Sequence, residues 1–268
     1  MTNILVRFYN TLIQKEYYVN RWKDIVEVML DKGKGLIIGK LRTIQLIEAN
    51  LQLLIQISIG MRNSENIEKN NNLSKYNFGS RRNYSIDTAL LEKRLIYDAS
   101  IKNEELHIHN MTDLEACYDR QLPKVSGLIQ EAVGVDRKCI KVIMRVITKF
   151  RHHICTNHRI SETYYGDDEE ELAGNGQGNL FTGAAYQDQS CRGFKNLEQK
   201  DLGVKFRQLL SKKAIQRVAI EFVDDTDFYS NGDKGQTKMQ RMINDYNKYY
   251  EITGGKISKD KSTYFCWQ

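Results

Sequence analysis

Apolar side chains recur at helical spacing along much of the N-terminal half of the chain. Within Ile4–Leu30 they fall on one face of each of two successive stretches, which predicts two packing helices in an N-terminal segment, residues 1–31. Residues 44–57, rich in leucine and isoleucine, predict a helix, or a strand followed by a helix. A further helix is expected from Ile86 to about Tyr97, with Ser85 as its N-cap.

The C-terminal half alternates short apolar runs with longer helical ones. Residues 105–118 predict a strand. An apolar run, residues 214–223, leads into a predicted hairpin over residues 222–229 that contains acidic residues. Helices are expected up to Gln199 and again over residues 238–252, and a short strand ends the chain. This order predicts an α+β fold with a ferredoxin-like βαββαβ core, in which one antiparallel sheet carries helices on one face.

Three aspartates within four residues mark the hairpin as the first candidate for chemistry. Asp224, Asp225 and Asp227 stand in the run FVDDTDFY, residues 222–229. Ionised carboxylates this close repel one another, so a buried group either binds protons at a raised pKa or is neutralised by a cation. Oxygen ligands of this kind suit Mg²⁺ or Mn²⁺. A solvated turn between two strands would contain the same residues, because Asp is common in turns.

Two basic segments and one glycine-rich loop are candidates for contacts with phosphate or main-chain ligands. The run KGKGLIIGKLR, residues 32–42, predicts a flexible basic hairpin whose cations either reach phosphate or face solvent. Arg81 and Arg82 beside Tyr84 suit a nucleic-acid strand, although an exposed loop would look the same. The glycines of GNGQGN, residues 174–179, permit positive φ and close approach of a ligand at a helix start.

Histidine and cysteine residues give no sign of a zinc site. His107 and His109 alternate onto one face of a predicted strand, without a carboxylate or thiol at ligand spacing, so we expect structural roles for them. The five cysteines are odd in number and contain no CxxC pair. This pattern argues against a secreted disulfide framework and against a cysteine zinc site.

Length and charge narrow the function classes further. At 268 residues the chain can bury a substantial core, and its net charge of +6 favours a polyanionic partner only mildly. No signal-peptide pattern opens the chain, and no apolar run reaches the roughly 18 to 20 residues of a membrane span. We therefore expect an intracellular protein, nuclear or cytoplasmic, that is neither secreted nor bound to a membrane.

Seven segments together resemble the motifs of one enzyme family. DLEACYD (113–119), GNGQGN (174–179), FVDD (222–225) and GGKISKDKS (254–262) resemble the four palm motifs of reverse transcriptases. Upstream, LRTIQL (41–46) and NFGSRRNYSIDTA (77–89) resemble their finger segments, and FCW (265–267) resembles the start of the primer-grip region. The motifs follow the family's order from about Lys32 onward, and their style is nearest to retroelement enzymes of the non-LTR retrotransposon and group II intron kind.

The resemblance implies a polymerase palm with fingers. Residues 1–31 would be N-terminal helices, residues 32–104 a fingers-like segment, and residues 105–268 the palm with its aspartates. The family's thumb is expected to be missing from this sequence, and a longer parent protein would supply the thumb or other domains.

The implied activity is RNA-directed DNA polymerisation, the template-directed addition of dNTPs to a primer 3′ hydroxyl. Two Mg²⁺ or Mn²⁺ ions would be held by Asp113 and Asp224, with Asp225 as a third carboxylate, and Lys261 would be a general acid for pyrophosphate. The partners would be an RNA template, a DNA or RNA primer and dNTPs. The resemblance also implies six substrate-binding residues: Tyr118 at the sugar, Gln177 and Gly178 at the template-nucleotide pair, Lys40 and Arg42 at the triphosphate, and Arg81.

Two other functions stay open at this point. An RNA-directed RNA polymerase would share the palm and its paired acids, but such enzymes typically have Gly-Asp-Asp where this chain has Val223-Asp224-Asp225. A catalytically silent retroelement remnant would bind nucleic acid weakly. The expected lack of a thumb favours the remnant, whereas the three intact aspartates oppose it.

Overall fold

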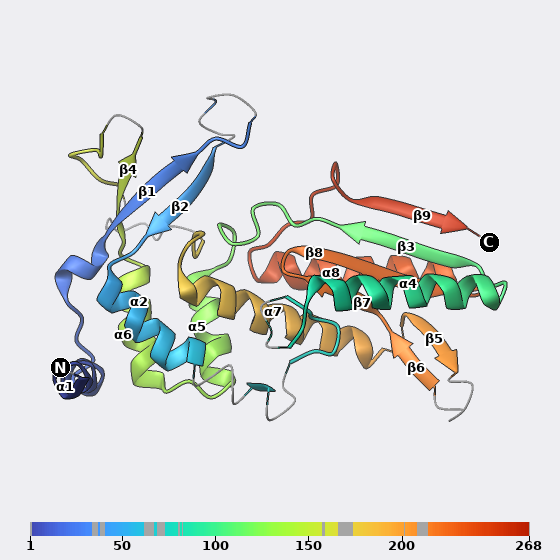
Figure 1. Ribbon diagram of the computed structural model, residues 1–268, viewed down its shortest axis with the longest axis horizontal. Helices are drawn as coiled ribbons and strands as arrows, with labels where there is room; N and C mark the ends of the chain where they lie inside the picture. The colour runs from blue at the N-terminus through green and yellow to red at the C-terminus, as the bar shows by residue number, and fades with distance from the viewer. Residues whose placement is uncertain are drawn as a thin grey trace. The chain divides into compact units, whose positions relative to one another are not determined.

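A computed structural model describes residues 2–33, 37, 41–61, 67–68, 73–79, 81, 83–156, 159–165, 174–200, 202–207 and 214–267 (Figure 1). The chain forms two compact units, one from Met1–Asn70 with Tyr118–Tyr186 and the other from Asn71–Cys117 with Gln187–Gln268. Each unit is thus assembled from two separate stretches of sequence. The predicted contiguous segments 1–31, 32–104 and 105–268 stay predictions.

The first unit contains a three-stranded sheet of order β2-β1-β4 and several helices. β1 runs antiparallel to β2 and parallel to β4. Its strands are β1 (Asp24–Leu30), β2 (Arg42–Leu46) and β4 (Arg151–Cys155). Its helices are α1 (Thr2–Gln14), η1 (Asn20–Lys23), α2 (Ala49–Ile55), η3 (Gln56–Met61), α5 (Pro123–Ala132) and α6 (Arg137–Ile147), followed by the start of α7 (Leu180–Glu198).

The core of the first unit is built on the amphipathic helix α6. Cys139, Ile143 and Val146 recur at intervals of three and four on its buried face, which packs with Trp22 and Leu51 in one cluster. Asp136 caps the helix by accepting hydrogen bonds from the main-chain N–H groups of its first turn. The apolar periodicity alone therefore accounts for how this unit closes.

The prediction of two N-terminal helices was wrong for the second of them. Residues 24–30 form strand β1, in which Ile25 and Glu27 are buried while their neighbours are more exposed. This alternation has a period of two, which matches a strand rather than a helix. The valines of DIVEVML also favour a strand, because branching at Cβ restricts χ1 in a helix. The predicted strand-helix pair over residues 44–57 is confirmed by β2 and α2.

The second unit contains a four-stranded antiparallel sheet of order β7-β8-β3-β9. In chain order β3 is the first of these strands and β9 the last, so the spatial order is second, third, first, fourth. The order of a βαββαβ core and the α+β class are thereby confirmed. The strands are β3 (His107–Thr112), β7 (Ala219–Phe222), β8 (Asp225–Asn231) and β9 (Thr263–Trp267), and the other elements are α4 (Ile86–Lys102), β5 (Val204–Arg207), β6 (Ala214–Arg217), α8 (Gly235–Ile252) and the end of α7.

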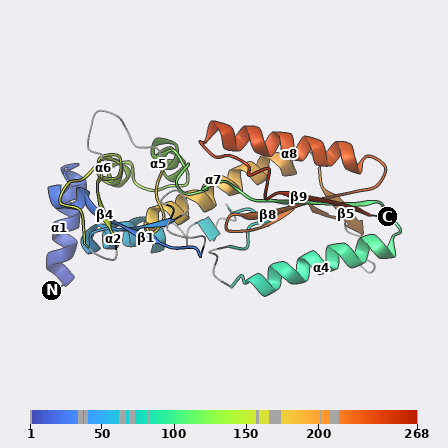
Figure 2. The ribbon, with the colours of Figure 1, turned by 90° about the horizontal axis from the view of Figure 1, so that it is seen from above.

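Helices cover both faces of this sheet, so the expectation that they lie on one face was wrong. Phe228 and Tyr229 are successive residues of β8 and must point to opposite faces. The ring centres of Phe228 and Tyr246 of α8 lie 4.8 Å apart, with the rings close to perpendicular. Tyr229 instead belongs to a buried cluster with Ala89 and Ile96 of α4. Figure 2 shows α8 on one side of the sheet and α4 on the other. The N-cap predicted for α4 is confirmed, because Ser85 Oγ accepts a hydrogen bond from the N–H of Thr88 at 3.2 Å.

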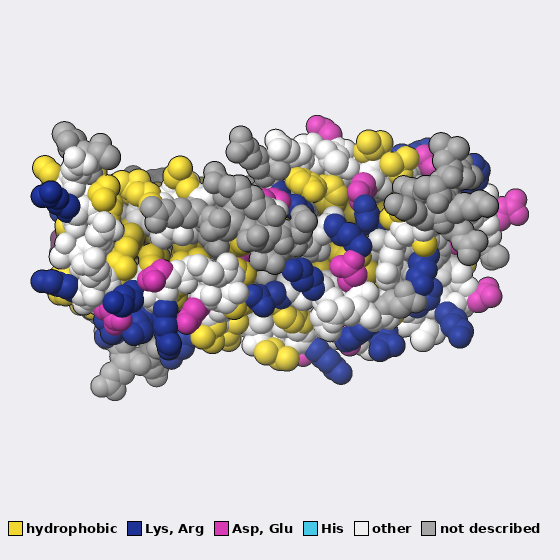
Figure 3. Space-filling view, turned by 90° about the horizontal axis from the view of Figure 1, so that it is seen from below, with side chains coloured by type: hydrophobic (Ala, Val, Ile, Leu, Met, Phe, Trp, Pro, Cys, Tyr) yellow, Lys and Arg dark blue, Asp and Glu magenta, His cyan; other side chains and the backbone are white. Residues whose placement is uncertain are grey.

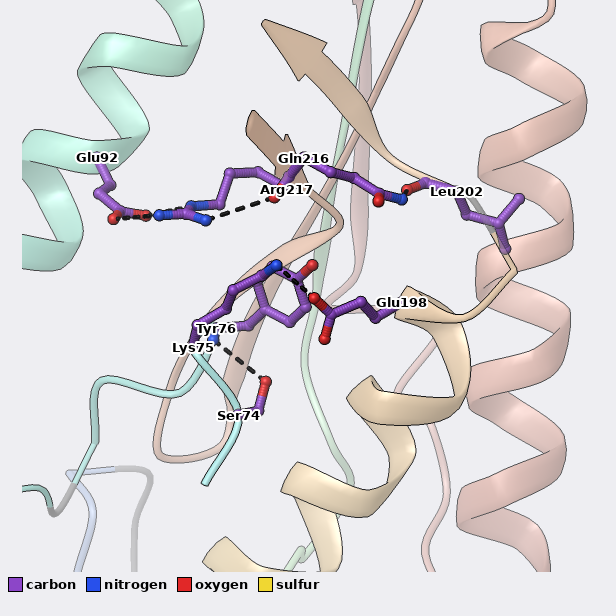
Figure 4. Close-up of polar contacts among 8 residues, drawn as sticks. All are labelled: Ser74, Lys75, Tyr76, Glu92, Glu198, Leu202, Gln216 and Arg217. Carbon is purple, nitrogen blue, oxygen red and sulfur yellow. Dashed lines mark hydrogen bonds and ion pairs between the residues drawn. The ribbon is translucent and has the colours of Figure 1, made fainter. Parts of the chain in front are cut away.

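Polar contacts fix α4 and the neighbouring loop to the second unit (Figure 4). Arg217 of β6 binds Glu92 of α4 through two hydrogen bonds, of 3.0 and 3.1 Å. Lys75 forms an ion pair with Glu198 at the end of α7. A planar guanidinium bound through two donors orients its partner as well as attracting it, so α4 is held in a defined position against β6.

The charged surface is dispersed on the face that Figure 3 shows. Lys and Arg side chains lie there in several groups, separated by hydrophobic and acidic side chains. No helix in the described part of the chain is long and apolar enough to cross a membrane.

Candidate functional site

The acidic hairpin turns through two residues, Val223 and Asp224. Phe222 pairs with Asp225 across the hairpin, so these two residues close the turn. Val223 has a φ of +61°, and Asp224 is not among the residues with positive φ. Positive φ at the first central residue alone is the pattern of a type II′ turn, which matches the twist of two strands. The turn places Asp224 at the tip of the hairpin and Asp225 at the start of β8.

A loop of the same unit lies against this turn. A Cβ atom on Gly79 would come within 2.4 Å of the main-chain nitrogen of Val223, so only glycine allows this approach. Just before it, the N–H of Phe78 donates to the carbonyl of Glu221 at 2.8 Å, and the N–H of Glu221 donates to the carbonyl of Tyr76 at 2.8 Å. The segment therefore extends the sheet alongside the hairpin.

Asp113 reaches the same place from the neighbouring strand. Thr112 at the end of β3 lies opposite Thr226 of β8, so Asp113 and Asp225 are the next residues outward on two adjacent antiparallel strands. The carbonyl of Asp113 accepts a hydrogen bond from the N–H of Ser258 at 2.9 Å. This hydrogen bond holds the loop of the predicted fourth motif, residues 254–262, against Asp113. In the same loop Lys261 Nζ lies 2.9 Å from Asp113 Oδ2.

Electrostatics shows that the four predicted catalytic residues share one environment. Burial and the charges of Asp224 and Asp113 raise the pKa of Asp225 above its ordinary value. The hydrogen bond to Asp113, together with the charges of Asp113 and Asp224, raises the pKa of Lys261. The three carboxylates thus influence one another electrostatically, and Lys261 is bound to one of them, Asp113.

The donor set fits a hard divalent cation, although the side chains are not arranged as a finished metal site. Among the described residues, no three His, Cys, Asp or Glu side chains stand close enough to hold an ion as they are. One oxygen of Asp113 is engaged by Lys261, whose side chain is 64% exposed and therefore free to move. The repulsion that raises the pKa of Asp225 is the condition that a bound cation would relieve.

Asp227 has a different role that the sequence did not reveal. It is buried and lies 2.9 Å from His109 Nε2, and it also forms an ion pair with Lys93 of α4. Burial raises its pKa, but the hydrogen bonds from His109 and Lys93 outweigh burial and hold the pKa below its ordinary value. Asp227 therefore ties the hairpin to β3 and α4. The structural role predicted for His109 agrees with this contact, whereas nothing in the sequence singled out Lys93.

The glycine-rich loop of the first unit approaches β2 and α2. The carbonyl of Gln177 accepts a hydrogen bond from the N–H of Gln45 at 2.7 Å, and the carbonyl of Gly178 accepts one from Gln52 Nε2 at 3.1 Å. Gly178 has a φ of +107°, and a Cβ there would come within 2.6 Å of the carbonyl oxygen of Gln45. The positive φ expected of these glycines is confirmed. The main chain approaches β2 here, and the predicted contact with a ligand stays a prediction.

The other predicted substrate residues are distributed over both units. In the first unit the ring centres of Tyr118 and Tyr186 lie 5.6 Å apart in a T-shaped arrangement. Arg42 is the first residue of β2 and lies opposite Leu30 of β1. Lys40 lies outside the described residues.

Arg81 belongs to the second unit. One of its guanidinium nitrogens donates to the carbonyls of Ser74 and Asn77 at 2.9 and 3.0 Å. Its guanidinium carbon lies 3.9 Å from the ring centre of Tyr84. These contacts hold its own loop, and the assignment of Arg81 to substrate stays a prediction.

A second acidic group, in the first unit, escaped the sequence analysis. Glu27 is 5% exposed and accepts hydrogen bonds from His152 Nδ1 at 2.7 Å, from the hydroxyl of Tyr165 and from Gln45 Nε2 at 3.4 Å. Burial raises the pKa of Glu27, but the hydrogen bonds from His152 and Tyr165 outweigh it and hold the pKa below its ordinary value. These residues line a cavity of about 200 Å³.

Comparison with known proteins relies on structure. No protein-family model matches the chain, and no curated protein matches it in sequence. A solved structure of telomerase from Candida tropicalis, in complex with a TWJ fragment of telomeric RNA, matches with a TM-score of 0.59 at 14% identity, over 99% of this chain and 44% of that chain. The Candida albicans telomerase, in complex with the same kind of fragment, matches with a TM-score of 0.60 at 14% identity, over 97% and 45%.

A third match is the apo telomerase from Candida tropicalis truncated from its C-terminal domain, with a TM-score of 0.60 at 13% identity, over 99% of this chain and 55% of that chain. The chain thus spans about half the length of these structures. At these identities the likeness concerns the fold. The βαββαβ order of the sheet agrees with it, and the chain has a reverse-transcriptase-like fold.

Proposed function

We propose that this chain is an RNA-directed DNA polymerase, which adds dNTPs to a primer 3′ hydroxyl under the direction of an RNA template. The observation that carries the proposal is the meeting of Asp113, Asp224 and Asp225 with Lys261 at the end of two central antiparallel strands. Two of the similar telomerases were solved with a fragment of telomeric RNA, which supports a nucleic-acid partner. The style of the motifs supports an enzyme of retroelement type, akin to those of non-LTR retrotransposons or group II introns.

The three carboxylates would hold two Mg²⁺ or Mn²⁺ ions. Asp113 and Asp224 are the proposed bridging ligands, and Asp225 joins them because the register sets it beside Asp113. Such ions, when bound, would activate the primer hydroxyl and neutralise the leaving pyrophosphate. Lys261 has a raised pKa and therefore keeps its proton at neutral pH, as a proton donor to pyrophosphate must.

The substrate would be positioned by residues of the predicted motifs. The bulky ring of Tyr118 would lie against the sugar of the incoming nucleotide and leave no room for a 2′ hydroxyl. The carbonyls of Gln177 and Gly178 are already engaged by Gln45 and Gln52, so their contact with the template-nucleotide pair would use other main-chain atoms. Three cations are proposed to bind phosphates: Lys40, Arg42 and Arg81.

Primer extension tests the proposal directly. An RNA template with an annealed primer is incubated with Mg²⁺ and either dNTPs or NTPs, beside Asp224→Asn. Asp233→Asn is the matched control, because Asp233 is an exposed aspartate of the same unit that lies beyond β8. We expect extension with dNTPs that Asp224→Asn abolishes and Asp233→Asn retains. Extension with NTPs alone would identify an RNA polymerase, and binding of primer-template without any extension would identify a silent remnant.

A further inference from the structure

A groove lies on the α4 side of the sheet in the second unit. It has a volume of about 350 Å³ and is lined by Lys93, Arg94 and Tyr97 of α4 and by His107, His109, Tyr229 and Trp267 of the sheet. We call it the α4 groove. The end of the groove at His107 and Trp267 lies on the order of 20 Å from the acidic turn, because His107 stands six residues before Asp113 on the extended strand β3. At the other end Lys93 and His109 contact Asp227, so it is the Trp267 end that is separate from the proposed catalytic site.

The floor of the α4 groove is aromatic and neutral. The ring centre of Trp267 lies 4.7 Å from that of His107 and 5.3 Å from that of Tyr97. His107 is 1% exposed, its Nδ1 is hydrogen-bonded to Ser100 Oγ at 2.7 Å, and burial lowers its pKa to about 4. A planar ring can stack on such a floor, because flat aromatic surfaces attract one another in offset arrangements.

Two donors in the groove have no acceptor. The Tyr229 side chain is 2% exposed, and among the described residues its hydroxyl finds no hydrogen-bond partner. The Nε1–H of Trp267 is likewise buried and has no partner in the described part of the chain. Buried donors are rarely left unpaired, because an unpaired donor loses its hydration without compensation. These two groups therefore favour a ligand that carries acceptor atoms.

The charges around the groove decide which aromatic ligands fit. Cages of aromatic rings commonly bind methylated ammonium groups. Here Lys93 is already paired with Asp227, Arg94 would repel a cation, and the described lining contains no acid. Arg94 is paired with Asp98 one turn along α4, yet its side chain is 69% exposed and is free to turn toward a ligand. An anionic group attached to the stacked ring would find Arg94 within the same groove.

We propose that the α4 groove binds one unstacked nucleotide, with its base on Trp267 and Tyr97 and its phosphate toward Arg94. The same chemistry is presented by a free nucleoside monophosphate and by an unpaired nucleotide within a single strand. Stacking on aromatic side chains tolerates any base, so the site selects for a ring bearing a phosphate rather than for sequence. The proposal does not depend on whether the acidic hairpin is catalytic.

Intrinsic fluorescence can report binding at this site alone. The chain has two tryptophans, and the other, Trp22, is fully buried in the first unit. In a Trp22→Phe variant, Trp267 is the only tryptophan, and a base stacked on it should quench the tryptophan emission. The probes are AMP, adenosine and a short oligoadenylate. We expect saturable quenching by AMP, with weaker binding of adenosine because it lacks the phosphate.

Two charge reversals serve as test and control. Arg94→Glu should raise the Kd for AMP about tenfold or more, whereas Arg241→Glu, at an exposed position of α8, should leave it unchanged. Tighter binding of the oligoadenylate than of AMP would assign the site to a strand, and equal binding would assign it to the free nucleotide. Asp224→Asn should leave the quenching unaltered, which separates this site from the proposed catalysis.

Either of two results would overturn the proposal. One is the absence of saturable quenching with both AMP and the oligoadenylate, and the other is an equal effect of the two arginine reversals. Titration calorimetry of the unmodified chain gives the same comparison without the change at Trp22. A groove that bound neither probe would not be a nucleotide site.

Discussion

The two units treat their carboxylates in opposite ways. In the first unit Glu27 is buried and accepts hydrogen bonds from His152, Tyr165 and Gln45, and its pKa is held below the ordinary value. In the second unit the Asp225 side chain remains largely open to solvent, and partial desolvation together with the charges of Asp224 and Asp113 raises its pKa. The protein thus satisfies Glu27 with its own donors and leaves Asp225 beside two further negative charges, of which only Asp113 is paired with Lys261.

This difference separates an acid whose hydrogen bonds are satisfied within the fold from acids that we propose bind a cation. A buried carboxylate with enough donors stabilises the folded state, because the donors replace its hydration. Carboxylates that lack such donors destabilise the folded state unless a cation joins them. The two groups should therefore respond in opposite directions to neutralisation and to pH, and four changes test that expectation.

The largest expected effect is the loss of extension in Asp113→Asn. Removing one charged group at a reacting centre slows reactions by about 10² to 10³, and the lost carboxylate also serves as a proposed metal ligand. The free energy of unfolding should stay within about 1 kcal/mol of wild type, because Asp113 forms only a surface ion pair, with the exposed Lys261. Single-turnover extension and urea unfolding measure the two quantities. Unfolding of the variant would make Asp113 an acid of the structural kind.

Lys261→Leu should slow single-turnover extension by about 10² to 10⁴, the usual contribution of a positioned proton donor. The matched change is Lys259→Leu, at an exposed lysine of the same loop, which should have little effect on the rate. If Lys261→Leu weakens only the binding of primer-template and leaves the rate of the chemical step unchanged, Lys261 is an ion-pair partner of Asp113 and not the proton donor.

Glu27→Gln should destabilise the first unit by about 1 to 3 kcal/mol at neutral pH, because the buried donors His152 and Gln45 and the hydroxyl of Tyr165 lose their common charged acceptor. The pKa of Glu27 is lowered on folding, so its contribution is present above the ordinary carboxyl value and is lost as pH falls through the lowered value. Urea unfolding of the variant across that acidic range should therefore be less pH-dependent than that of wild type. Equal pH dependence would mean that Glu27 is not the satisfied acid we describe.

Asp225→Asn should have the smallest effect and the opposite sign. The pKa of Asp225 is raised on folding, so its favourable contribution belongs to low pH and disappears as pH rises through the raised value. At neutral pH the variant should be more stable than wild type, by less than about 1 kcal/mol because water screens the exposed side chain. Thermal unfolding at pH 7 measures the gain, which added Mg²⁺ should reduce by stabilising the wild type alone. A loss of stability would contradict the repulsion.

Local patterns predicted the elements of the second unit well. The cap at Ser85 and the terminal strand followed from short stretches of sequence, and the motif order led to Asp113 beside the hairpin. The prediction that all helices cover one face of the sheet failed for α4, because both the buried and the exposed sides of that helix carry apolar residues. Ala89 and Ile96 are buried, while Leu91 and Leu95 are 59% and 57% exposed, so periodicity could not tell which side faces the sheet.

The contacts of Glu27 could not be predicted from the sequence. Its partners His152 and Tyr165 lie 125 and 138 residues further along the chain. No local pattern links residues so far apart, and the strand that turns Glu27 inward was taken for a helix. The pairing of Asp227 with His109 escaped for the same reason, since 118 residues separate them. Side chains that satisfy one another across the fold emerge only from its topology.

The positive φ of Val223 has a consequence for motion. A β-branched residue in this conformation costs on the order of 1 to 3 kcal/mol, which the surroundings must offset. The offset comes from the segment ending at Gly79, which pairs with Glu221 and lies against the main chain of the turn. If that segment detaches, the turn loses its restraint, so the two should open together. In hydrogen exchange, the amides of Phe78 and Glu221 should therefore exchange at one common rate, as members of a single cooperative unit.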